Sequence, residues 1–116
     1  MNNLKNNKLI AEFMGGINEM PKGYILYCCI PDKLCKDTHF FKPEDMQFHS
    51  SWDWFMPVVA KIESLTIEKI PTFVQIEWNY CFIYGATTIH MERKSKLEAV
   101  YDAVIEFIKL YNKQKN

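Results

Sequence analysis

Alternation of side chains between two faces from residue 72 to residue 78 is the clearest pattern in the chain. Val74, Ile76 and Trp78 would lie on one face of this segment, and Phe73, Gln75 and Glu77 on the other. Alternation of this kind is typical of a β-strand with one buried face. The segment is therefore expected to form a strand of an antiparallel sheet.

Two further strands are expected directly after it. Trp78-Asn79 can form the tip of a hairpin, and Tyr80–Tyr84 then returns as the second strand. Gly85 interrupts the pattern, and Thr87–Met91 follows as a short third strand. Because the connections are short, consecutive strands are expected to pair antiparallel.

Helical periodicity is strongest near the end of the chain, from Lys96 to Asn112. Ser95 and Glu98 have the spacing of a capping box, which marks the start of a helix. The apolar stripe consists of Leu97, Val100, Tyr101, Val104, Ile105, Phe107, Ile108 and Tyr111. Such a stripe predicts an amphipathic helix that packs on the sheet.

A second helix is expected after Ser50. The Ser50 side chain can cap the helix, and the Asp53 side chain can accept a hydrogen bond from the backbone N–H of Ser50. Apolar side chains then recur at helical spacing at Trp54, Phe55, Val58, Val59 and Ile62. Pro57 lies inside this pattern and removes one backbone hydrogen bond, which predicts a kink or a tight opening turn.

The first half of the chain is less regular. A short helix is expected from a cap at Asn6 or Asn7 to Gly15-Gly16, and Tyr24–Ile30 has the length and composition of a buried strand. Residues 31–47 fit either a packed loop or a short strand near Met46–His49.

These elements together predict one α+β domain over residues 1–116. Its expected core is an antiparallel sheet of three to four strands with helices packed on its faces. A chain of this length suits one domain rather than two.

Charge and composition argue against two classes of partner, nucleic acid and membrane. Acidic and basic residues balance at 14 each, and Arg93 is the only arginine. Nucleic acid is therefore not expected as a partner, because its binding needs a cationic face. No secretory signal or membrane span is evident, so a cytoplasmic protein with no membrane partner is expected.

Metal-ligating residue types gather only at Cys28, Cys29, Cys35 and His39. A zinc site usually draws on regularly spaced pairs of ligands, and this spacing is irregular. The adjacent cysteines fit better as small packed side chains in a reducing compartment. Neither a metal nor a cofactor is expected.

The start of the second helix offers a candidate interface in Trp52 and Trp54. Residues two apart on a helix do not share a face, so one indole is expected in the core and the other partly exposed. A partly exposed tryptophan suits a partner interface, although a lid over the sheet edge is the favoured interpretation.

The start of the last helix offers a candidate anion site in Arg93, Lys94 and Lys96. Unpaired N–H groups at a helix start together with basic side chains can hold a phosphate. The favoured interpretation is a solvent-exposed helix start at which Glu92 and Glu98 offset the positive charge of these residues.

Three blocks of sequence resemble a known group of proteins. They are Leu9–Gly15, His49–Val59 continuing to Lys61–Glu63, and Ser95–Ile108, and the string Trp-Asp-Trp followed by Met-Pro-Val-Val is the most specific part. These blocks resemble small uncharacterised proteins of Bacteroides-type bacteria and their phages or prophages, some grouped as a phage ABA-sandwich domain. The resemblance implies a sheet between helix layers and a bacterial cytoplasmic setting, and it implies no activity.

The leading functional hypothesis is a non-enzymatic phage or prophage accessory protein that binds another macromolecule or itself. Its support is the absence of catalytic motifs and an aromatic content of 15%. A small-ligand or anion-binding domain is the alternative. An enzyme in which one of the three histidines activates Cys35 or Cys81 comes third, because nothing resembles a nucleophile elbow or a phosphate loop.

Overall fold

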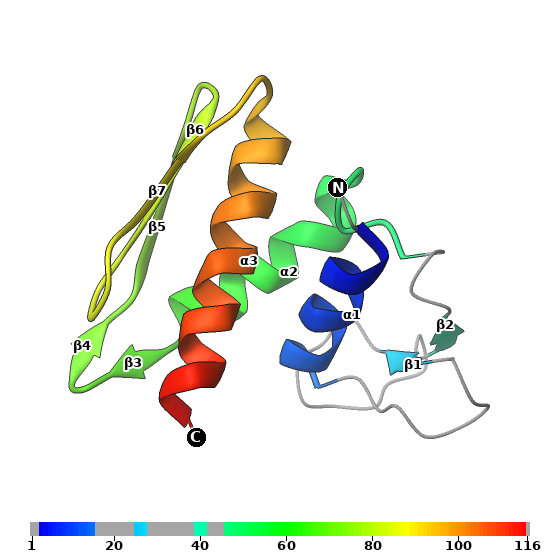
Figure 1. The fold of residues 1–116 in the computed structure, drawn as a ribbon, viewed down its shortest axis with the longest axis horizontal. Coiled ribbons are helices and arrows are strands. Elements are labelled where there is room, and N and C mark those ends of the chain that lie inside the picture. Colours follow the sequence, from blue (N-terminus) through cyan, green and yellow to red (C-terminus); the bar gives the residue numbers. More distant parts are fainter. Residues whose placement is uncertain (1–2, 16–24, 28–38, 42–45, 116) are drawn as a thin grey trace. The chain divides into compact units, whose positions relative to one another are not determined.

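The computed structural model describes residues 3–15, 25–27, 39–41 and 46–115. Its described elements are helices and antiparallel strands, and a helix packs on the largest sheet, so the predicted α+β class is confirmed. The chain divides into two compact units, Met1–Val58 and Val59–Asn116. Figure 1 labels the elements of both units.

The second unit is built on a three-stranded sheet of β5 (Phe73–Glu77), β6 (Tyr80–Tyr84) and β7 (Ile89–Glu92). The strands pair antiparallel in the order β5-β6-β7, with Cys81 opposite Ile76 on one side and Met91 on the other. The predicted hairpin at Trp78-Asn79 is confirmed. The third strand begins two residues later than expected, because residues 85–88 form the connecting bend.

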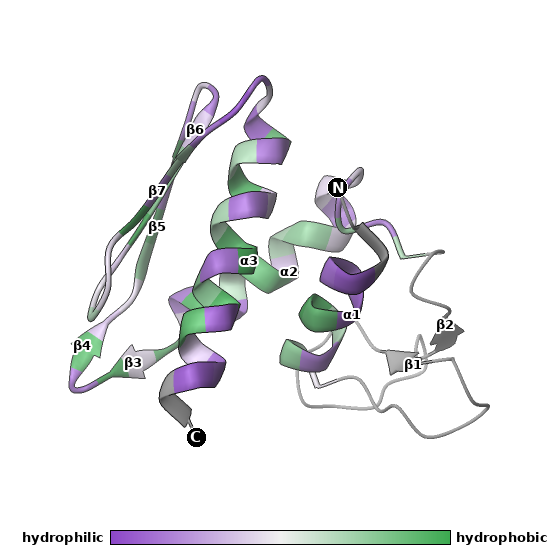
Figure 2. Ribbon diagram, in the orientation of Figure 1, coloured by the Kyte–Doolittle hydropathy of each residue, from purple (hydrophilic) through white to green (hydrophobic). Residues whose placement is uncertain are grey.

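Helix α3 (Lys96–Lys115) lies across one face of this sheet and contacts all three strands (Figure 1). Its start is capped as predicted, because the backbone N–H of Glu98 donates to Ser95 Oγ at 3.2 Å. Apolar and polar bands alternate along the helix in Figure 2. Its buried residues are Ala99, Val100, Tyr101, Ala103, Val104, Ile105, Phe107 and Ile108. The predicted amphipathic helix is therefore confirmed.

Strand alternation gives the sheet two different faces. The face that packs on α3 carries Cys81, Ile83 and Ile89, which are buried, and we call it the inner face. The opposite side chains form the outer face. They are Phe73, Gln75, Glu77, Tyr80, Phe82, Tyr84, His90 and Glu92. All of them are at least partly exposed, and no other described element of this unit lies over them in Figure 1.

A small hairpin that the sequence pattern did not predict precedes the sheet. It consists of β3 (Thr66–Ile67) and β4 (Ile70–Pro71), paired antiparallel around Glu68 and Lys69. Both turn residues have positive φ, at 53° and 66°. Two consecutive left-handed residues are the backbone of a type I′ turn, which Asn-Gly normally supplies.

Gly85 ends β6, as the pattern predicted, and its lack of a side chain has a steric reason. A Cβ at this position would lie 2.9 Å from the carbonyl oxygen of Pro71. Backbone from the end of β4 therefore approaches the end of β6 at a distance that only glycine accepts without a shift.

The first unit begins with α1 (Asn3–Phe13), and Gly15, with φ 91°, lies in the turn directly after it. The predicted stop is confirmed, but the predicted cap at Asn6 or Asn7 is wrong because the helix starts earlier. Asn7 is instead a buried helical residue whose side-chain amide donates to the carbonyl of Met46 at 3.1 Å. The same nitrogen lies 3.1 Å from Nδ1 of His49.

Strands β1 (Ile25–Tyr27) and β2 (His39–Phe41) pair antiparallel, with Leu26 opposite Phe40. The strand predicted over Tyr24–Ile30 is present at its described residues, and its other positions lie outside them. The short strand considered near Met46–His49 is absent, since that segment leads into a turn.

Helix α2 (Trp52–Glu63) runs continuously through Pro57. Its first hydrogen bond joins the N–H of Phe55 to the carbonyl of Ser51 at 3.1 Å. Ser51 therefore occupies the cap position, one residue later than the predicted Ser50. The expected apolar side is buried at Phe55, Val58, Val59 and Ile62.

Candidate functional site

A row of aromatic rings crosses the outer face of the sheet. Alternation along β6 places Tyr80, Phe82 and Tyr84 on this face, and His90 of β7 is the partner of Phe82 in the register. The Phe82 ring stacks on His90 with centroids 4.3 Å apart and on Tyr84 at 5.8 Å. Tyr80 meets Phe82 edge-on at 5.4 Å. These contacts hold the rings in fixed positions on the sheet.

A row of polar groups runs beside the rings along β5. Oε2 of Glu77 accepts a hydrogen bond from the Tyr80 hydroxyl at 2.7 Å and another from Nε2 of Gln75 at 3.1 Å. The hydroxyl of Tyr84 donates to Oε1 of Gln75. The hydrogen bond to Glu77, with smaller contributions from burial and neighbouring charge, raises the pKa of Tyr80 above its ordinary value. The phenol therefore stays neutral and keeps the Glu77 carboxylate oriented.

Two large apolar side chains stand exposed at the ends of β5. Phe73 is 59% exposed at its start, and Trp78 is 83% exposed in the turn that follows. The sequence pattern placed Trp78 on the same face as Val74 and Ile76, which is wrong because Trp78 belongs to the turn rather than the strand. Its side chain projects from the hairpin tip instead.

Trp78 also has an unusual backbone conformation, with φ 51°. Bulky residues rarely adopt positive φ, because the Cβ then approaches the carbonyl oxygen. Hairpins whose first loop residue has positive φ usually place glycine there. A strained and exposed tryptophan is a feature that functional sites tend to show.

The predicted interface residues Trp52 and Trp54 are both half-buried in the first turn of α2. The Trp54 ring meets Phe48 edge-on at 5.2 Å, and the Trp52 ring meets Phe55 at 6.5 Å. Both indoles thus have ring partners within their own unit. The strongly exposed tryptophan is Trp78, which the sequence pattern placed at the hairpin tip but did not indicate as an interface residue.

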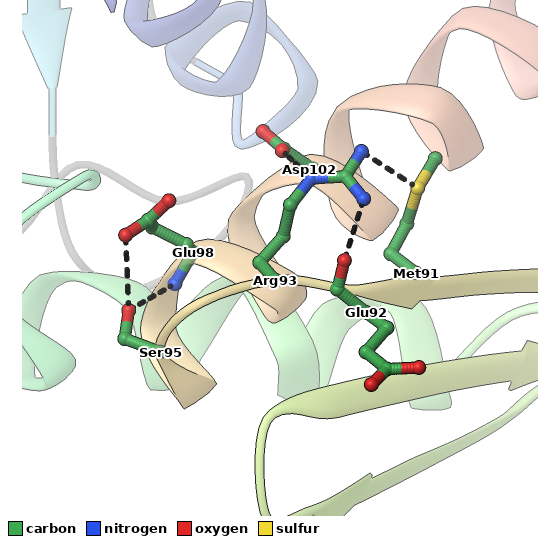
Figure 3. A network of polar contacts seen from close by, with 6 residues as sticks. All are labelled: Met91, Glu92, Arg93, Ser95, Glu98 and Asp102. Carbon is green, nitrogen blue, oxygen red and sulfur yellow. Dashed lines mark hydrogen bonds and ion pairs between the residues drawn. The ribbon is translucent and has the colours of Figure 1, made fainter.

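Of the predicted anion-site residues, Arg93 and Lys94 line the same hollow and Lys96 does not. Arg93 reaches Asp102 of α3, with Nε 2.7 Å from Oδ2, and also donates to the Glu92 carbonyl at 2.8 Å (Figure 3). Lys94 lines an open hollow together with Asn79, Glu92, Arg93 and Glu98, and Lys96 is not among its lining residues.

This arrangement weighs against anion binding as the main use of the helix start. The charge of Arg93 is paired, and two carboxylates line the same hollow as Lys94. The carboxylates of Glu92 and Glu98 repel an anion that approaches this hollow. The anion site stays a prediction that no further contact supports.

Cys81 lies on the inner face and is fully buried. Burial raises the pKa of its thiol to about 11. His90 projects from the opposite face, because it pairs with Phe82 whereas Cys81 pairs with Met91. Those two residues therefore cannot form the catalytic pair considered from the sequence.

The possible metal cluster falls mostly outside the described residues. Cys28, Cys29 and Cys35 are not described, and His39 is described only as a residue of β2. Within the described parts of the chain, no group of three or more His, Cys, Asp or Glu side chains could hold a metal. No described helix is long and apolar enough to cross a bilayer.

A small cavity of about 10 Å³ lies at the other end of the sheet. Its lining residues come from the β6–β7 bend, the last turns of α3, and Ile67 and Thr72. The Oγ1 atom of Thr72 is buried there without a hydrogen-bond partner among the described residues. This volume suits about one water molecule, so the cavity is too small for a substrate.

Comparison with protein-family models, with curated proteins and with solved structures gave no match.

Proposed function

We propose that the chain is a non-enzymatic binding protein that recognises another macromolecule, or a second copy of itself, through the outer face and the hairpin tip. One observation carries the proposal. Trp78 is 83% exposed and held at positive φ, although glycine would satisfy the same turn with less strain. Tryptophan at this position is unfavourable for the isolated fold, and contact with a partner would account for it.

The rest of the outer face fits this proposal. Phe73 exposes a second apolar ring, and the row from Tyr80 to Tyr84 extends the aromatic surface between the two ends of β5. Aromatic side chains are enriched at interfaces, and rigid rings lose little conformational freedom on binding.

Replacing the two exposed rings tests the proposal directly. A Phe73→Thr/Trp78→Gly variant removes both anchors and should fold at least as well as the parent, because glycine accepts positive φ. The parent and the variant are compared in sedimentation velocity for self-association and in capture of partners from a bacterial lysate. A complex that forms with the parent and is lost with the variant is the expected result.

Met56→Gln is the matched control, because Met56 is another exposed large apolar residue, 47% exposed and located on α2. This control should keep the complex. A complex that survives in the Phe73→Thr/Trp78→Gly variant would contradict the proposal, and so would a parent protein that is monomeric and captures nothing.

The phage or prophage setting belongs to the same proposal and rests on the sequence resemblance. A binding protein of this size fits an accessory role, in which one chain modifies the action of another. Genes next to the coding sequence test this part, since phage structural or regulatory genes are expected there. A neighbourhood of unrelated metabolic genes would contradict it.

A further inference from the structure

The charges on the sheet are of one sign. Residues 73–92, which contain all three strands, include no lysine or arginine. Glu77 and Glu92 both lie on the outer face, one on each edge strand. The cations that follow β7 are Arg93, which is paired with Asp102, and Lys94, and both line an open hollow with Glu92. Glu77, on the other edge strand, has no such neighbours among the residues that line the hollow. In Figure 3 the Glu92 carboxylate points away from the Arg93 guanidinium. The outer face is thus both aromatic and acidic.

From this combination we infer that the outer face binds an arginine-bearing segment of a partner protein. The inference rests on the proposed binding function and adds the chemistry of the partner. Aromatic rings and carboxylates together favour a cation, since the ring face attracts it and the carboxylate accepts its hydrogen bonds.

Glu77 is the best-placed acceptor for such a cation. Its Oε2 atom already accepts from Tyr80 and Gln75, at 2.7 and 3.1 Å, which fixes the direction of the carboxylate. The structure gives Oε1 no hydrogen bond from any described residue. An oriented carboxylate with one unused oxygen can receive a guanidinium N–H without first losing side-chain freedom.

Trp78 provides an exposed ring at the hairpin tip, in the turn next to Glu77. It follows Glu77 directly, and no described aromatic ring stacks on its exposed indole. Phe82, in contrast, stacks with both His90 and Tyr84. Indole is the strongest cation–π partner among the aromatic side chains, and arginine is the cation that most often uses it.

The length of the surface fits an extended segment. Phe73 and Glu77 lie at the two ends of β5, roughly 13 Å apart at about 3.3 Å per residue. A partner strand of similar length could place an apolar side chain on Phe73 and an arginine at the Glu77–Trp78 end.

Other classes of partner suit the face less well. A single-stranded nucleic acid would also stack on exposed rings, but its phosphates would meet Glu77 and Glu92 and no lysine or arginine of the sheet. Two outer faces meeting across a two-fold axis would bring carboxylates of the same sign together. Binding of nucleic acid is an outcome of the test below, and self-association is measured by the sedimentation velocity experiment above.

The test measures fluorescence anisotropy of a labelled peptide that alternates arginine and threonine. The same peptide with lysine, the same with glutamate, and a single-stranded oligonucleotide serve as comparison probes. The arginine peptide should bind best, and the glutamate peptide and the oligonucleotide should not bind. Glu77→Gln should weaken binding about tenfold, because it removes a charged hydrogen-bond acceptor, and Trp78→Gly about threefold.

Two more variants keep the result interpretable. Glu68→Gln changes the net charge equally but lies in the β3–β4 turn, so it should leave the affinity unchanged. Glu92→Gln removes an outer-face charge whose carboxylate holds no hydrogen bond from a described residue, and it should weaken binding about twofold. Circular dichroism confirms that each variant is folded.

Three outcomes would overturn the inference. They are equal weakening by Glu68→Gln and Glu77→Gln, binding of the oligonucleotide at this face, and no binding of the arginine peptide. If the last occurs while a complex still depends on Phe73 and Trp78, the binding function stands and only the chemistry of the partner is wrong. If the arginine peptide does not bind and no complex depends on Phe73 and Trp78, both the binding function and the chemistry of the partner are wrong.

Discussion

Burial decides the chemistry of Cys81. The thiol is fully buried against α3, and burial raises its pKa to about 11. We expect alkylation of Cys81 by iodoacetamide at pH 8 to be far slower in the folded protein than in urea, because the thiolate is the reactive form. Peptide mass spectrometry at successive times measures the modification of this one residue. Folded-state labelling as fast as in urea would contradict the assignment.

The same pKa shift makes stability depend on pH. The thiol has an ordinary pKa of 9.0 and a raised pKa in the folded state, so the unfolded chain releases this proton first. The stabilisation is complete below pH 9 and is lost as the pH rises toward 11. Urea denaturation of the parent and of Cys81→Ala should therefore converge over this range, and Tyr80 titrates equally in both proteins. A constant difference would argue against the shift.

Thr72 is a residue whose hydroxyl is expected to reduce stability. Its Oγ1 atom is buried without a hydrogen-bond partner among the described residues, and such an atom loses its hydration without compensation. Thr72→Val keeps the shape and should raise the free energy of unfolding by about 1 kcal/mol. Urea denaturation measures the change. A less stable valine variant would show that the hydroxyl is satisfied by a bridging water in the small cavity.

At the scale of elements, the β3–β4 turn is the segment most open to improvement. Glu68 and Lys69 both have left-handed φ, which costs a non-glycine residue about 1 kcal/mol or more. Replacing them with Asn-Gly should raise the free energy of unfolding by about 1–2 kcal/mol. Thermal and urea denaturation measure the gain. Lys69→Ala is the control and should gain little, since alanine meets the same steric penalty.

The elements that the sequence predicts well are those whose signals are local. Helix α3 has its cap and its stripe within one segment, and the β5–β6 hairpin has alternating strands around a two-residue loop. The β3–β4 hairpin escaped notice because Glu-Lys is not a turn signal. Its positive φ values are imposed by the surrounding structure rather than by the residues themselves.

Features that depend on distant residues could not be predicted in the same way. Asn7 is a residue type that often caps helices, yet α1 starts at Asn3, and the side chain of Asn7 is buried against Met46, which lies 39 positions away. The candidate site was missed for a related reason. The run Tyr80–Tyr84 is apolar on both faces, and this could have indicated an exposed aromatic surface, but only the packing of α3 shows which face is covered.

At the scale of the whole molecule, the interface between α3 and the sheet should dominate the stability of its unit. Ile83 lies on the central strand and is fully buried, whereas Ile70 in β4 is 43% exposed. We expect Ile83→Val to lower the free energy of unfolding by about 1 kcal/mol and Ile70→Val to change it by at most about 0.5 kcal/mol. Urea denaturation of both variants checks the difference, and equal losses would contradict this description of the core.

The hydrogen bond from the backbone N–H of Arg93 to the carbonyl of Asn79, at 2.9 Å, has a consequence for recognition. It ties the turn that carries Trp78 to the residue that follows β7, so the tip is held by this bond as well as by the β5–β6 pairing. An incoming chain then meets a backbone that is already ordered. Binding at this turn therefore loses less conformational entropy than binding to a flexible loop would. A small contact area can then be enough for recognition.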